Sequence, residues 1–224
     1  MNQPLILGID SAGNGASIAV LRGGDVAAMR TDPRPHGQAE ILMPMIADAL
    51  TEAGIEAAAL AAIGVATGPG SFTGLRIAIA AARGLALATG SPAIGITRFD
   101  AVAAQFPPER RFGRALLVAL DTRRGDFFLQ LFRDRADEPF LASGDDAPRA
   151  LPETPILLAG DAAHRLAPHL AGRDIRIADN PDRPLAADVA RLAAVAYRDG
   201  VATPPRPLYL RAPDTTVPRR EAAR

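Results

Sequence analysis

Two aspartates occupy equivalent places in the two halves of the sequence. Asp10 ends an apolar run and is followed by Ser11 and a glycine-containing turn, and Asp121 ends a second apolar run and is followed by Thr122 and a similar turn. In a cleft, the amides of two such turns can hold phosphate groups while the carboxylates position a metal ion or a water molecule. An aspartate after a strand is also a common turn residue. The pattern therefore predicts either a phosphate and metal site or two plain turns.

The composition limits the other chemistry that the chain could perform. There is no Cys, and all 25 basic residues are Arg, which excludes thiolate metal sites, a Cys nucleophile and a Schiff-base or P-loop Lys. Besides His36, the histidines are His164 and His169, which are five residues apart, about 140° around a helix, and so do not share a face. We expect no bound metal, and a peptidase would lack a nucleophile, base and metal set.

The charge balance gives no reason to expect a polyanionic partner. The chain has 25 Lys+Arg against 25 Asp+Glu, only 4% aromatic residues and no Trp. A balanced charge produces no long-range electrostatic field that would attract nucleic acid or an anionic membrane. So few aromatic residues also offer no platform on which bases could stack. We interpret the segment that carries Arg219, Arg220 and Arg224 as a solvated tail. The alternative is that these arginines contact RNA phosphates. The apolar run over residues 5–9 is too short for a signal peptide, so we expect a cytoplasmic protein.

The most distinctive string is a glycine-rich loop between an expected strand and an expected helix. Its amides and the helix dipole could hold an anion, but its spacing fits neither a P-loop nor a dinucleotide fingerprint. A tight structural turn explains it as well. The string consists of Gly68, Pro69, Gly70, Ser71, Phe72, Thr73, Gly74, Leu75 and Arg76.

Alternating apolar runs and turn residues predict a duplicated α/β fold. In the first half, strands are expected over residues 5–9, 16–21, 26–31, 61–67 and 93–96, with helices over 37–53, 75–89 and 99–105. In the second half, strands are expected over 115–120, 127–132 and 156–159, helices over 162–170 and 186–198, and irregular chain over 134–155. We expect two lobes, residues 1–106 and 107–224, with a cleft between them.

The helices over residues 37–53 and 75–89 carry more apolar surface than a solvent-facing helix needs. One interpretation is that the protein's own sheet covers both faces, and the other is that they form an interface with a partner chain. The interface residues predicted on this second interpretation are Ile41, Leu42, Met45, Ile46, Leu75, Ile77, Ala78, Ala81 and Leu85.

Several strings resemble the TsaB family, the dimerisation subunits of the bacterial machinery that makes threonylcarbamoyladenosine in tRNA. They are GIDSAGNGASIAVL at residues 8–21, GPGSFTGLR at 68–76, GLALATGSPAIGI at 84–96, ALDTRRGDFFLQLF at 119–132 and PLYLR at 207–211. The first 100 or so residues match well and the rest mainly in layout. The resemblance implies a two-lobed, duplicated actin-like (ribonuclease H-like) fold with mixed sheets flanked by helices.

The resemblance also implies a non-catalytic scaffold with defined partners. The two apolar helices would pair with a TsaD-type transferase, or with a second copy when that is absent, and a TsaE-type ATPase and tRNA would join the complex, tRNA indirectly. Only weak binding of ATP or ADP with Mg²⁺ is expected, at Asp10, Ser11, Asp121 and Gly160, because the superfamily's Gly-Gly turn is reduced here to one Gly. The alternative is a small ATPase or kinase that uses Asp10 and Asp121.

Overall fold

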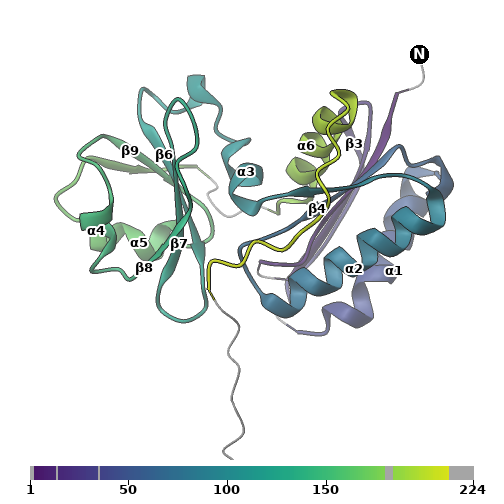
Figure 1. Cartoon of the computed structure of the whole chain (residues 1–224), viewed down its shortest axis with the longest axis horizontal. Helices are drawn as coiled ribbons and strands as arrows, with labels where there is room; N and C mark the ends of the chain where they lie inside the picture. The colour runs from purple at the N-terminus through teal and green to yellow at the C-terminus, as the bar shows by residue number, and fades with distance from the viewer. Residues whose placement is uncertain (1–2, 14, 35, 180–183, 212–224) are drawn as a thin grey trace, which may run out of the picture.

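Each half of the chain builds a five-stranded mixed sheet. The computed structural model describes residues 3–13, 15–34, 36–179 and 184–211. The first sheet has the order β3-β2-β1-β4-β5, in which β1 pairs antiparallel with β2 and parallel with β4 (Figure 1). Its strands are β1 (Leu5–Asp10), β2 (Ala16–Arg22), β3 (Asp25–Asp32), β4 (Ala62–Ala66) and β5 (Ala93–Ile96).

The second sheet repeats this topology strand for strand. Its order is β10-β9-β6-β7-β8, in which β6 pairs antiparallel with β7 and parallel with β9. The strands are β6 (Ala115–Asp121), β7 (Phe127–Phe132), β8 (Phe140–Ala142), β9 (Ile156–Ala159) and β10 (Ile175–Ile177). The predicted duplication and fold class are confirmed. The sequence analysis missed β8 and β10, which are three-residue edge strands with too few residues to show an alternating pattern.

Glycines and a serine set the ends of the long helices. Gly54 and Gly90 end α1 and α2 in the left-handed conformation, as is common at a helix C-terminus. The Ser71 hydroxyl accepts a hydrogen bond from the Gly74 amide at 3.2 Å, so α2 begins at Phe72 rather than at the expected Leu75. The α-helices are α1 (Gln38–Ala53), α2 (Phe72–Thr89), α3 (Arg98–Ala103), α4 (Ala147–Ala150), α5 (Ala163–Leu166) and α6 (Ala186–Arg198), and 3₁₀ turns span Ala57–Ala59, Pro108–Arg110 and Ala167–Leu170.

Helix α6 crosses back from the second half of the chain to the first sheet. Helices α1 and α2 cover one face of that sheet and α6 the other, with α3 between the two sheets (Figure 1). A Cβ at Gly8 in β1 would collide with the Ala186 carbonyl oxygen, so a glycine is required for this close approach. The packing unit of the first sheet thus includes a helix from the expected second lobe, residues 107–224.

The last described residues join the two lobes. The Gly95 amide donates to the Thr203 carbonyl at 2.8 Å, and the Leu208 amide donates to the Thr67 carbonyl at 2.7 Å, so this segment runs along the end of the first sheet. Arg211 then pairs with Asp126 in the second lobe. We call residues 203–211 the C-terminal strap.

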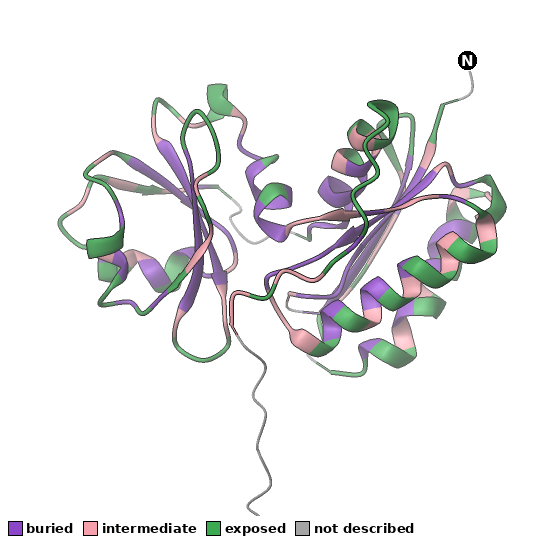
Figure 2. Cartoon of the chain, viewed as in Figure 1, coloured by how far each residue is buried: buried purple, intermediate pink, exposed green. Residues whose placement is uncertain are grey.

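The outer face of α2 is exposed in the isolated chain, so the interpretation in which the protein's own sheet covers both faces of this helix is wrong. Its buried residues are Gly74, Leu75, Ala78, Ile79 and Ala82, of which the last three pack into the core on the first sheet (Figure 2). Among the described residues, α2 is the helix that is long and apolar enough to cross a membrane by length and composition. A core helix of a water-soluble domain meets the same criterion, and α2 packs on β4 and α1.

Candidate functional site

A buried arginine links carboxylates from both lobes. Arg98, the first residue of α3, places its Nε 3.4 Å from Oδ2 of Asp10 and its Nη2 3.2 Å from Oδ2 of Asp161. The three side chains are only 5%, 7% and 5% exposed. Arg98 Nη1 also donates to the Pro69 carbonyl at 3.3 Å. We call Asp10, Arg98 and Asp161 the interlobe cluster.

Three of the four predicted nucleotide-binding residues, Asp10, Ser11 and Gly160, are buried. Oδ1 of Asp10 accepts a hydrogen bond from the Ala12 amide at 2.9 Å, as a turn aspartate does. The Ser11 hydroxyl donates to the Gly74 carbonyl at 2.8 Å and is buried. Gly160 is buried too, and a Cβ there would collide with the Ala119 carbonyl oxygen.

Asp121, the fourth predicted residue, is only partly buried. Its Oδ1 is 2.5 Å from Nη1 of Arg165 and accepts a hydrogen bond from the Arg123 amide at 2.7 Å. Its own amide donates to Oδ1 of Asp161 at 2.7 Å. Asp10 and Asp121 line different cavities, of about 330 Å³ and 530 Å³. The predicted nucleotide-binding set is therefore not brought together around one cavity.

The interlobe cluster does not fit a magnesium nucleotide of the kind that the fold family implies. Such a ligand needs a carboxylate that can face the metal, whereas the outer oxygen of Asp10 already faces a guanidinium group. The two turns also touch, because Arg123 Nη2 donates to the Gly13 carbonyl at 2.5 Å. A metal nucleotide at Asp10 would have to displace Arg98.

Sequence reasoning missed Arg98 and Asp161. Both follow parallel strands, β5 and β9, whose carboxyl ends approach the ends of β1 and β6 at the lobe junction. The available signal was that a charged residue follows the expected strand over 156–159, as Asp10 follows the strand over 5–9. An arginine near the start of a helix gave no comparable signal.

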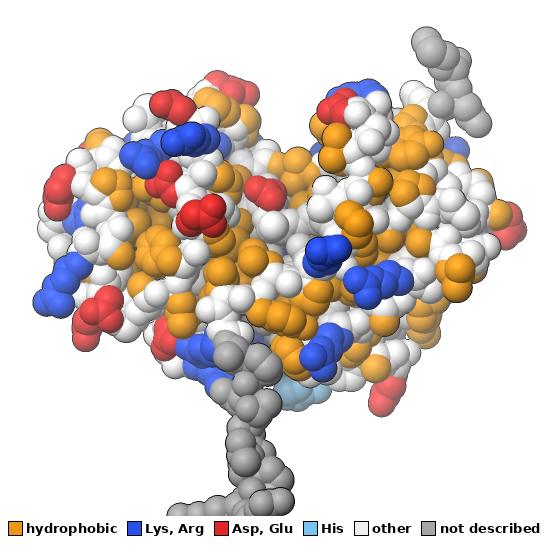
Figure 3. Space-filling model, viewed as in Figure 1, with side chains coloured by type: hydrophobic (Ala, Val, Ile, Leu, Met, Phe, Trp, Pro, Cys, Tyr) orange, Lys and Arg blue, Asp and Glu red, His pale blue; other side chains and the backbone are white. Residues whose placement is uncertain are grey.

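The distinctive loop instead lines an open pocket at the lobe junction. The pocket has a volume of about 530 Å³ and is walled by three separate segments of chain. We call it the junction pocket, and its lining residues are Pro69, Gly70, Ser71, Phe72, Asp121, Thr122, Arg123, Arg124, Phe128, Leu208, Tyr209, Leu210 and Arg211. Figure 3 shows arginine side chains on both sides of the lower end of the groove between the lobes.

Two strings singled out in the sequence meet beside this pocket. The rings of Phe72 and Tyr209 have centroids 5.1 Å apart, and Cζ of Arg76 lies 3.7 Å from the Phe72 centroid. Arg76 Nε also donates to the Tyr209 hydroxyl at 3.5 Å. Arg83, two turns further along α2, donates to the Pro205 carbonyl at 2.7 Å. The loop and α2 as far as Arg83 therefore anchor the C-terminal strap.

The predicted interface set is partly wrong. Leu42, Ile46 and Ala78 are at most 1% exposed and belong to the core between α1, α2 and the first sheet, and Leu75, 1% exposed, lies against Gly68. These four residues cannot be outward contacts. The other five pack partly against the same core; they are Ile41, Met45, Ile77, Ala81 and Leu85. The outer surface of the two helices carries Met43, 46% exposed, and Leu87, 89% exposed.

The described histidines and acids form no metal centre. Within the described ranges, no group of three or more His, Cys, Asp or Glu residues could hold a metal ion. His164 and His169 are both exposed. Arg219, Arg220 and Arg224, which the sequence analysis placed in a solvated tail, lie outside the described residues.

Solved structures and family models of known proteins show which fold class this chain has. An activator of 2-hydroxyisocaproyl-CoA dehydratase from Clostridium difficile, solved with bound ADPNP, shares the fold with a TM-score of 0.53 at 11% identity, over 88% of this chain and 96% of that chain. The model of the family TsaD, tRNA N6-adenosine threonylcarbamoyltransferase, matches residues 34–147. The protein is thus a duplicated α/β protein of the actin-like class.

Closer relatives narrow this class to one family. The Escherichia coli tRNA threonylcarbamoyladenosine biosynthesis protein TsaB is 32% identical over 173 residues, 77% of this chain and 70% of that protein. A Pseudomonas aeruginosa protein with similarity to the peptidase YeaZ has a TM-score of 0.74 at 26% identity, over 93% of this chain and 100% of that chain. The chain belongs to the TsaB family.

Proposed function

We propose that this protein is a non-catalytic subunit in the synthesis of threonylcarbamoyladenosine in tRNA, at the adenosine 3′ of the anticodon. Membership of the TsaB family supports the pathway, because the Escherichia coli relative is named for the biosynthesis of that nucleoside. The match of residues 34–147 to the TsaD family model supports a shared ancestry with the transferase of the same pathway. The expected cytoplasmic location follows from this role.

The interlobe cluster is the observation that supports a non-catalytic role for this protein. A kinase or ATPase of this fold would need carboxylates that hold a metal ion and orient the attacking group. Here the buried guanidinium of Arg98 lies against both Asp10 and Asp161. Asp121 faces Arg165 instead. The alternative of a small ATPase or kinase therefore has no geometric support, and weak binding of ATP or ADP with Mg²⁺ stays a prediction.

The outer face of α1 and α2 is the surface we propose for a TsaD-type transferase. Its exposed residues on α2 are mostly small or apolar, so another chain could approach closely; they are Thr73, Arg76, Ala80, Arg83, Gly84, Leu87 and Ala88. Met43 extends the apolar surface onto α1. A second copy of this chain would use the same face when the transferase is absent. A TsaE-type ATPase would then join, and tRNA would be contacted indirectly.

The test is the assembly of this chain with the TsaD-type transferase of the same organism. Size-exclusion chromatography with light scattering should show a one-to-one complex, and Leu87→Glu should abolish it, because the charge would be desolvated without a partner. The matched control is Leu141→Glu on β8, where Leu141 is 36% exposed on the other lobe. Far-UV circular dichroism should be unchanged in both variants. Assembly that survives Leu87→Glu would contradict the proposed surface.

A further inference from the structure

The outer face of α2 carries two positive charges and no negative charge. Arg76 and Arg83 are the charged residues of this 18-residue helix, and both are exposed. We propose that these two arginines select a docking partner that presents two carboxylates to α2, namely an acidic segment of the transferase. This selection rests on the proposed function, because it names the chemistry that the partner of that surface must have.

The contacts of both arginines within the described chain are with uncharged groups. Cζ of Arg76 lies 3.7 Å from the centroid of the Phe72 ring, and its Nε donates to the Tyr209 hydroxyl at 3.5 Å. Nη2 of Arg83 donates to the Pro205 carbonyl at 2.7 Å. Such groups leave the positive charge in place. A guanidinium has five N–H donors, so each arginine keeps donors with which to bind a carboxylate.

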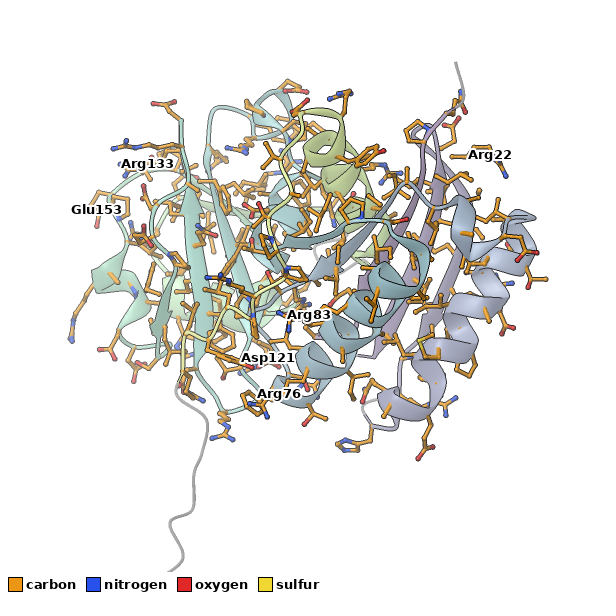
Figure 4. All side chains as sticks on the ribbon, turned by 45° about the vertical axis from the view of Figure 1, so that its right-hand side comes forward. Arg22, Arg76, Arg83, Asp121, Arg133 and Glu153 are labelled. Atoms are coloured by element: carbon orange, nitrogen blue, oxygen red, sulfur yellow. The ribbon has the colours of Figure 1, made fainter. Side chains whose placement is uncertain are left out.

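The C-terminal strap holds the two arginines along one edge of the outer face. Figure 4 shows Arg76 and Arg83 on α2, at the side where the strap runs. They are seven residues apart, so at a rise of 1.5 Å per residue they are about 10 Å apart along the helix axis. Because the strap already restrains both side chains, less side-chain freedom is lost when a partner binds. The matching partner therefore has two carboxylates about 10 Å apart, as acidic residues seven positions apart on a helix are.

The residues beside the arginines favour a protein partner over RNA. Ala80, Gly84 and Leu87 are exposed on the same face of α2, and Leu87 is 89% exposed. A phosphate backbone would leave these small and apolar groups in contact with water, and two arginines supply few of the phosphate contacts on which RNA affinity depends. A protein segment could cover the apolar residues while its carboxylates reach the arginines at the edge.

The same charges disfavour a second copy of this chain that packs its α2 against α2. Such pairing is symmetric, so each helix would bring its own Arg76 and Arg83 to the interface, and neither helix would bring a carboxylate. Like charges across an interface cost affinity, whereas opposite charges speed the encounter and fix its register. The two arginines would therefore favour an acidic transferase surface over self-association through α2.

Charge variants of the full chain test this selection in complex with the transferase of the same organism. By calorimetry, Arg76→Glu and Arg83→Glu should each weaken binding about tenfold or more, whereas Arg83→Lys should stay within about threefold. In the double variant Arg76→Gln with Arg83→Gln, binding should depend less on salt between 50 and 500 mM NaCl than in the unaltered chain. Arg149→Glu is the matched control, because Arg149 is an exposed arginine on α4 in the other lobe. Far-UV circular dichroism should be unchanged in every variant.

Three results would overturn the inference. They are full affinity in both Glu variants, an equal loss in Arg149→Glu, and the same dependence on salt in the double Gln variant as in the unaltered chain.

Two further outcomes separate the inference from the proposed function. If Leu87→Glu abolishes the complex while Arg76→Glu and Arg83→Glu bind normally, the proposed surface stands and the charge selection is wrong. If the unaltered chain forms no complex, the proposed function fails and the selection fails with it. If light scattering shows that Arg83→Glu loses self-association but keeps the transferase complex, the arginines serve a second copy, and the inference is overturned.

Discussion

Two neighbouring places at the junction of the lobes use arginine in opposite ways. In the interlobe cluster, one buried guanidinium lies between two carboxylates and is enclosed by protein. In the junction pocket, Arg123, Arg124 and Arg211 line an open cavity of about 530 Å³, and Arg211 pairs with Asp126. The comparison indicates that burial decides the role. The buried arginine links carboxylates of the two lobes, whereas the arginines of the junction pocket lie at an open surface between the lobes.

The largest expected effect on stability comes from replacing Arg98, the buried arginine of the interlobe cluster. Arg98→Met should lower the free energy of unfolding by about 3–5 kcal/mol, because Asp10 and Asp161 would remain buried without their counter-ion. Urea denaturation followed by circular dichroism measures the difference.

Two controls make this prediction specific. Arg133→Met removes the exposed pair with Asp137 and should change the free energy of unfolding by less than about 0.5 kcal/mol. The variant that adds Asp10→Asn and Asp161→Asn to Arg98→Met should recover part of the loss. If Arg98→Met costs no more than Arg133→Met, the cluster does not hold the lobes together.

A smaller effect is expected from the wall of the junction pocket. Tyr209→Ala removes the ring contact with Phe72 and should lower the free energy of unfolding by about 0.5–1.5 kcal/mol beyond the loss of buried area. Tyr197→Ala on α6 is the matched control, because both tyrosines are 42% exposed. Equal losses from the two variants in urea denaturation would show that the strap is not anchored through Tyr209.

The smallest effect concerns an exposed ion pair. The side-chain hydrogen bond from Arg34 holds the pKa of Asp32 below its ordinary value of 3.8. A lowered folded-state pKa stabilises the fold above the ordinary value, and this contribution is lost as the pH falls through the lowered pKa. In Arg34→Ala, an NMR titration should show the pKa of Asp32 returning upward, with little change in stability at neutral pH because the pair is exposed. An unchanged pKa would contradict the assigned cause.

More of the fold than of the candidate site could be predicted from the sequence. The repeated strand, aspartate, turn and strand indicated a duplication, and the glycines at positions 54 and 90 gave the ends of α1 and α2. Local pattern is enough for such features, because strands and helix ends depend on neighbouring residues. The short strands β8 and β10 depend on the sheet that they join, so the local pattern did not reveal them.

The site depends on contacts between residues far apart in sequence. Asp10, Arg98 and Asp161 come from separate strand and helix ends, and no spacing rule connects them. Four of the nine predicted interface residues were wrong for a related reason. The apolar stripe of an amphipathic helix marks the face toward the core, as Leu42 and Ala78 do, whereas an exposed residue such as Leu87 lies outside that stripe.

The central claim is that this chain supports tRNA modification without contributing catalytic groups. The direct measurement is the initial rate of threonylcarbamoyladenosine formation with purified TsaD-type transferase and TsaE-type ATPase, with the chain present, omitted or replaced by Asp121→Asn. The account predicts that omission removes most of the activity and that Asp121→Asn stays within about tenfold of the unaltered chain. A loss of about 10²–10⁴-fold in Asp121→Asn, in a variant that still assembles with the transferase, is the size expected for a lost general acid or base and would contradict it.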